Sequence, residues 1–287
     1  MERESGTRAL NGYELASRLS YFLWSSMPDE ALLRAAADGS LGRPEGVEAQ
    51  LRRMLADPKA KALATNFAGQ WLELRNLDSV SPDPKRFPEW DADLREAMRR
   101  ETLLFFSTLL TEDRSILDLL DGKFTFLNER LAKHYGIPGV TGRNFRRIEL
   151  DGAQRSGVLT QASVLTVTSY PTRTSPVQRG LWVLENFLAA PPPAPPADVP
   201  PLDEEKIGTA VTLRQQMERH RADPGCAVCH TKMDALGFGL ENYDPVGAWR
   251  SQDGQFPVDS AGALPGGRAF TNPAELKTIL RADAEDG

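Results

Sequence analysis

The pentapeptide Cys-Ala-Val-Cys-His at residues 226–230 constrains this chain more than any other feature of its sequence. The chain holds two cysteines and three histidines in 287 residues, and both cysteines and one histidine lie within these five positions. Two thiols at this spacing can each add to one vinyl group of a haem, and the adjacent histidine can then bind the iron. We therefore predict one covalent haem c, with Cys226 and Cys229 as its anchors and His230 as the proximal ligand.

Three other interpretations of this motif remain open. A redox-active dithiol usually follows a strand in a βαβ unit, whereas residues 212–221, which precede this motif, are polar and helix-like. A structural zinc ion could be held by Cys226, Cys229 and His230, with His220 as the fourth ligand. A local disulfide is the simplest alternative. With zinc or a disulfide, the segment would be a stapled scaffold module.

Charge and hydropathy argue against two classes of protein. The net charge of −6 and the lack of a concentrated Lys/Arg stripe predict no nucleic-acid binding. No run of about 18 apolar residues is present, so the sequence predicts no membrane span. The first residues are charged and do not resemble a signal peptide, although haem attachment to C-x-x-C-H takes place outside the bacterial cytoplasm. We therefore expect an internal fragment of a longer protein that is periplasmic or otherwise extracytoplasmic.

Helical periodicity dominates the first half of the chain. Caps or first-turn prolines at Asn11, Asp29, Pro44 and Asp57 each predict the start of a helix. Further apolar stripes predict a long helix over 92–110 and a short one over 128–135. We predict an all-helical domain of unknown function over residues 1–140.

Residues 141–287 combine predicted strands, helices and a proline-rich spacer. A short strand is predicted at 145–150, and periodicity leaves residues 157–166 open between helix and strand. The expected elements that follow are helices after Ser175, over 213–221 and after Asn272, and a small β-hairpin within 248–259. Seven prolines within residues 191–201 predict a semi-rigid spacer. The glycine-rich run over 233–244 suits close approach of the backbone to a flat ring.

Several stretches resemble the planctomycete cytochrome-c-type multidomain proteins. Residues 13–29 (YELASRLSYFLWSSMPD) are similar to the start of the helical domain of that family. Its cytochrome-c-like domain is similar to residues 157–163 (GVLTQAS), 173–176 (RTSP), and 220–244 with Trp249 and Arg250. The resemblance covers nearly the whole chain and implies a mainly α fold. In that fold a helical domain (1–140) precedes a cytochrome-c-like haem domain (141–287), which includes the Pro-rich spacer and the small hairpin.

The same resemblance implies an extracytoplasmic haem protein of uncharacterised physiological role. Members of this family carry an upstream cytochrome domain and a further C-terminal domain. We expect both to be missing from this chain, which would make it one part of a longer polypeptide.

The sequence offers few candidates for the second ligand of the haem iron. Met233 is the only methionine or histidine after His230, and it would lie one helical turn away on the same side of the ring. His220 is a possible distal ligand, whereas Met217 fits the buried face of its helix better. Haem propionates need hydrogen-bond donors, and the candidates are Arg173, Arg179 and Arg250.

These inferences favour one-electron transfer within an exported multidomain redox protein, with other domains or proteins as redox partners. The helical domain would dock those partners. The alternative is a haem enzyme with an open iron site, peroxidase-like or another oxidoreductase. The second alternative is the zinc- or disulfide-stapled scaffold.

Overall fold

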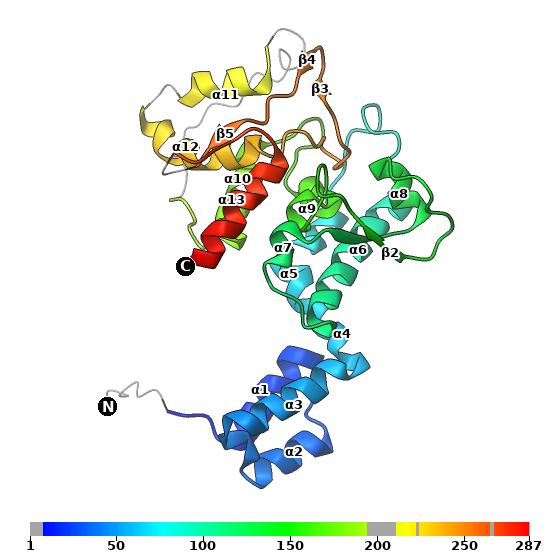
Figure 1. The fold of residues 1–287 in the computed structure, drawn as a ribbon, viewed down its shortest axis with the longest axis vertical. Coiled ribbons are helices and arrows are strands. Elements are labelled where there is room, and N and C mark those ends of the chain that lie inside the picture. Colours follow the sequence, from blue (N-terminus) through cyan, green and yellow to red (C-terminus); the bar gives the residue numbers. More distant parts are fainter. Residues whose placement is uncertain (1–7, 194–210, 222–223, 265–266, 287) are drawn as a thin grey trace. The chain divides into compact units, whose positions relative to one another are not determined.

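The computed structural model describes residues 8–193, 211–221, 224–264 and 267–286. Over these residues helices dominate, and the strands form three short antiparallel pairs (Figure 1). This confirms the prediction of a mainly α protein with a small hairpin. No helix in the described ranges is both long and apolar enough to cross a bilayer.

The chain folds into two compact units. The first comprises residues 1–70 and 106–114, and the second comprises residues 71–105 and 115–287. Helix α6 (Ala92–Thr111) contributes residues to both. The boundary predicted at residue 140 therefore does not separate these units, because residues 71–105 and 115–140 fold with the second half of the chain.

The helices of the first unit begin where local capping chemistry predicts. Asn11 forms a capping box with Glu14 at the start of α1 (Gly12–Trp24), and Asp29 caps α2 (Glu30–Ala37). Pro44 begins α3 (Pro44–Ala56). An interrupted helical stretch follows, made of η2 (Pro58–Ala60), α4 (Lys61–Leu63), the π-helical η3 (Ala64–Ala68) and α5 (Gly69–Trp71). Apolar side chains of α1, α2, α3 and α4, together with Leu41, form one buried cluster.

The second unit contains a two-stranded sheet that the sequence predicted only in part. Strand β1 (Phe124–Leu127) pairs antiparallel with β2 (Arg146–Glu149), which confirms the strand predicted at 145–150. The all-helical prediction for residues 1–140 is wrong at β1. A run of four residues is too short to show a period, and its partner lies beyond residue 140. The other elements of this part are η4 (Leu74–Asp78), α7 (Asp118–Asp121) and α8 (Glu129–Tyr135).

Within residues 157–166 the structure forms two short helices, η5 (Val158–Thr160) and α9 (Ala162–Val167), and no strand. Ser175 caps α10 (Pro176–Asn186), as predicted. The later elements are α11 (Leu213–Arg221), α12 (Pro224–Phe238), β3 (Gln252–Asp253), β4 (Phe256–Pro257), β5 (Gly262–Ala263), β6 (Ala269–Phe270) and α13 (Pro273–Asp286). Strands β3 and β4 are the expected hairpin. Most of the Pro-rich spacer, residues 194–201, lies outside the described residues.

Helices α10 and α12 pack at very short range (Figure 1). A methyl group added to Gly180 on α10 would overlap the carbonyl oxygen of Met233, and one added to Gly237 on α12 would overlap that of Pro176. These glycines let the two backbones touch. The expected approach of the glycine-rich run to a flat ring is thus, at Gly237, an approach to another helix.

The close contact predicts that Gly180→Ala destabilises the protein, whereas helix propensity alone predicts that it stabilises the helix. Gly180→Ala would stabilise an exposed helix by about 1 kcal/mol, but here the methyl group forces the helices apart. We expect a loss of about 3 kcal/mol in the free energy of unfolding, measured by urea denaturation. Lys232→Ala, at an exposed position of α12, is the control and should stay within about 0.5 kcal/mol. A neutral or stabilising Gly180→Ala would contradict the close packing.

Candidate functional site

Helix α12 carries the Cys-x-x-Cys-His motif. Its backbone is helical from Pro224, so Cys226, Cys229 and His230 occupy its first two turns. Positions three and four apart lie toward one side of a helix, which gathers the three residues along one edge. The side chains of Cys226, Cys229 and His220 lie outside the described residues, and their predicted roles stay predictions.

The imidazole of His230 is held by a carboxylate one turn further along α12. Its Nδ1 lies 2.9 Å from Oδ1 of Asp234, a residue that is fully buried, whereas the His230 side chain is 17% exposed. A carboxylate only accepts hydrogen bonds, so Nδ1 carries the proton in this pair. In the neutral ring the lone pair is then on Nε2, the nitrogen that would face a metal.

Two methionines, Met217 on α11 and Met233 on α12, are buried. Met217 is 2% exposed and belongs to a buried cluster with Leu213 and Phe238, as its place on the buried face of the helix predicted. Met233 is 6% exposed, at the contact of α12 with α10. Both positions fit a packing role for these side chains.

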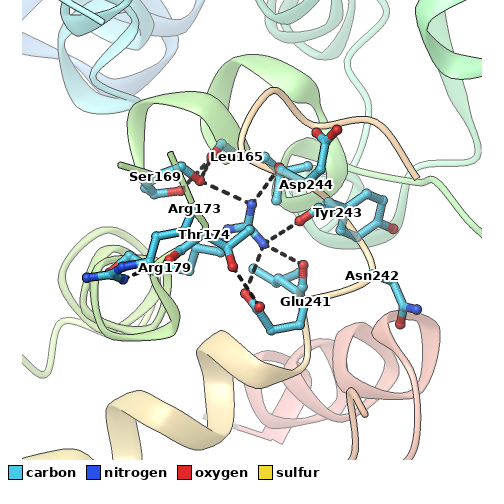
Figure 2. A network of polar contacts seen from close by, with 12 residues as sticks. Leu165, Ser169, Arg173, Thr174, Arg179, Glu241, Asn242, Tyr243 and Asp244 are labelled. Atoms are coloured by element: carbon cyan, nitrogen blue, oxygen red, sulfur yellow. Dashed lines mark hydrogen bonds and ion pairs between the residues drawn. The ribbon is translucent and has the colours of Figure 1, made fainter. Parts of the chain in front are cut away.

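Arg179 is the centre of a buried polar network beside α12 (Figure 2). The two terminal nitrogens of its guanidinium donate to Leu240 O, Tyr243 O, Asp244 O, Glu241 Oε1 and Ser169 Oγ, at distances between 2.7 and 3.3 Å. Burial lowers the pKa of Arg179 to about 10, so the group stays charged at neutral pH. Three of these five acceptors are backbone carbonyls of the segment that follows α12.

Arg250 and Arg173 also contact protein groups. Arg250 donates to the backbone O of Glu241 at 3.0 Å and to its Oε2 at 3.1 Å, and it pairs with Asp253 at 2.7 Å. Arg173 lies 4.4 Å from the ring centre of Tyr170. These contacts give the three predicted propionate ligands, Arg179 included, structural partners within the protein, and their contacts with haem stay predictions.

Two more basic side chains bind the same segment a few residues further along the chain. His134 Nε2 donates to Val246 O at 2.7 Å, and Arg155 donates to Gly247 O at 2.5 Å. Burial lowers the pKa of His134 to about 4, which keeps the ring neutral. This contact gives His134 a structural role in the second unit.

Sequence patterns missed several buried ionisable groups, among them Glu101 and Lys277. Glu101 is 1% exposed and accepts hydrogen bonds from the hydroxyls of Thr125 and Tyr135, each at 2.6 Å; burial raises its pKa to about 7. Lys277 is 1% exposed and donates to the backbone O and the hydroxyl of Ser156; burial lowers its pKa to about 7. Both lie on amphipathic helices, where the sequence gives no sign that a charged residue faces inward.

The network around Arg179 predicts a large cost for removing the charge of Glu241. In Glu241→Gln, the guanidinium of Arg179 stays buried without its carboxylate, so we expect the free energy of unfolding to fall by about 3 kcal/mol. Urea denaturation followed by circular dichroism measures this. Asp253→Asn removes the more exposed partner of Arg250 and should cost less than about 1 kcal/mol. Equal effects of both changes would contradict the central place of Glu241.

The lowered pKa of Lys277 predicts a pH dependence of stability. Between pH 7 and about 10 the unfolded chain holds a proton on this lysine that the folded protein lacks, so stability rises with pH in this window. We expect wild type to gain up to about 1.4 kcal/mol per pH unit relative to Lys277→Met. Urea midpoints at pH 7, 8 and 9 test this, with exposed Lys232→Met as the control. Parallel profiles for wild type and Lys277→Met would refute it.

Two family models match separate parts of the chain. Residues 10–137 match PSD4, described as a protein of unknown function (DUF1592), and residues 155–253 match PSCyt3, described as a protein of unknown function (DUF1588). No curated protein and no solved structure matched the chain. The names and the order of the two matches are consistent with the resemblance to the planctomycete cytochrome-c-type multidomain proteins, and each match covers less than half of the chain.

Proposed function

We propose that this chain binds one covalent haem c on α12 and transfers single electrons within a longer, extracytoplasmic redox protein. The observation that carries this proposal is the Cys-x-x-Cys-His motif on a helix whose histidine has its Nδ1 directed at a buried carboxylate. The match of residues 155–253 to a domain of cytochrome-c-type proteins supports it.

The residues of α12 fit the chemistry of attachment. A thiol adds across a vinyl double bond, its sulfur to one carbon and its hydrogen to the other, so two cysteines would form two thioether bonds without a further reactant. Cys226 and Cys229 are the only cysteines of the chain. His230 follows directly, and its Nε2 would be the ligand atom because Nδ1 is engaged by Asp234.

A bound haem would supply the one-electron couple of its iron. The role of the protein would be to hold the haem and to form its surroundings. Helix α12 is fixed by its close contact with α10 and by the network at Arg179, so the ligand would sit on a rigid element. A rigid site keeps the reorganisation that accompanies a change of charge small.

A haem enzyme with an open coordination position is the second candidate. The positions of Met217 and Met233 favour it. Both methionines are buried, and packing accounts for them without a role as the second iron ligand. The visible and electron paramagnetic resonance spectra discriminate between the two functions. A low-spin, six-coordinate spectrum favours electron transfer, and a high-spin spectrum favours the enzyme.

The test of the proposal is a pyridine haemochrome spectrum of the full chain, exported from a host with the c-type maturation machinery. We expect about one thioether-linked haem per chain, retained through denaturing gel electrophoresis. Cys226→Ala/Cys229→Ala should lose it, whereas Lys232→Ala, the exposed control on the same helix, should keep it. Folded, exported protein without haem would refute the proposal. Zinc analysis and a thiol count would then choose between the zinc-stapled and the disulfide-stapled scaffold.

A further inference from the structure

We infer that Asp234 is the positioning residue of the haem ligand: it fixes the ring of His230 and lowers the reduction potential of the haem iron. This inference rests on the haem site proposed above. It adds a residue that the motif does not contain. Asp234 lies four positions after His230 on α12, and its Oδ1 is 2.9 Å from Nδ1 of the imidazole.

The placement of this carboxylate is built into the packing of α12. The backbone of Met233, directly before it, touches α10 at Gly180, and Gly237, one turn later, touches α10 at Pro176. Asp234 lies between these two contacts and is fully buried. His230 and Asp234 are one turn apart on the same helix, so the helix sets the distance between their backbones, and burial of Asp234 restricts where its carboxylate can turn.

A buried carboxylate changes the imidazole more than a neutral acceptor would. A charge-assisted hydrogen bond is roughly twice as strong as a neutral one, and burial in a medium of low dielectric strengthens it further. The bond pulls the Nδ1 proton toward Asp234 and leaves more electron density on Nε2, which makes the ring a stronger donor. A stronger donor and a nearby negative charge both stabilise the oxidised, more positive iron over the reduced one.

Burial distinguishes Asp234 from an aspartate on the exposed surface of a helix. An exposed Asp at this spacing would exchange its contact with His230 for water at little cost. With no exposed surface, Asp234 keeps its contacts inside the protein. The pair is therefore preorganised before any cofactor is attached.

The test compares haem-loaded wild type with Asp234→Asn. We expect the equilibrium constant for reduction to increase at least tenfold, which is a rise of about 59 mV in the midpoint potential for one electron. The frequency of the iron–histidine stretching vibration in the reduced form should fall, because Nε2 becomes a weaker donor. Asp234→Glu, which keeps the charge, should recover much of the wild-type potential.

The matched control is Asp259→Asn, which removes one carboxylate from an exposed position in the same unit. Its potential should stay close to that of wild type. If Asp234→Asn shifts the potential no more than Asp259→Asn does, the inference is overturned. Haem content, measured as pyridine haemochrome in every variant, keeps this outcome apart from failure of the haem proposal itself, in which wild type would carry no haem.

A second measurement needs no variant at Asp234. In the reduced carbon monoxide complex the iron is diamagnetic, so the Nδ1 proton of His230 can be observed by NMR in protein with ¹⁵N-labelled histidine. We expect a downfield proton that exchanges slowly with solvent, as a buried, charge-assisted bond requires. A rapidly exchanging proton would overturn the inference even where Asp234→Asn fails to fold.

Discussion

The burial of two arginine side chains against the backbone that follows α12 is the interaction on which the second unit depends. Arg179 donates to carbonyls at Leu240, Tyr243 and Asp244, and Arg155 donates to Gly247. A buried guanidinium is costly unless its donors find acceptors, and a turn leaves some of its carbonyls without a backbone partner. The terminal nitrogens of the two arginines bind these carbonyls, so the turn and the arginines can be buried together. Glu241 neutralises the charge that this arrangement brings inside.

The turn that follows α12 connects the candidate site to residues from earlier in the chain. His134 and Arg155 come from residues before 156, whereas the carbonyls they bind lie at Val246 and Gly247. The segment after the motif is therefore joined to α8 and to the approach to η5. At its other side, the close contact of α10 with α12 fixes the helix that carries His230. Helix α12 is therefore held both at its flank and at its C-terminal end.

Much of the local structure could be predicted from the sequence. Caps at Asn11, Asp29 and Ser175 set helix starts, because a side-chain oxygen that binds a free backbone N–H acts within three residues. The strand at Phe124–Leu127 was missed because four residues show no period and the pairing partner is distant in sequence. The three arginines illustrate the same limit: a sequence shows a basic residue beside a motif, but not whether its partner is a cofactor or the backbone of the protein itself.

For the function, the sequence by itself determined the spacing of two cysteines and one histidine on which the haem proposal rests, because local spacing fixes the local geometry of a helix. Only the tertiary structure decided which other groups meet at the site. That Asp234 is buried beside His230, that Glu101 and Lys277 face inward, and that Gly180 meets Met233 all follow from packing between elements far apart in the chain. Burial depends on the neighbours that a residue meets in three dimensions, and one sequence does not list those neighbours.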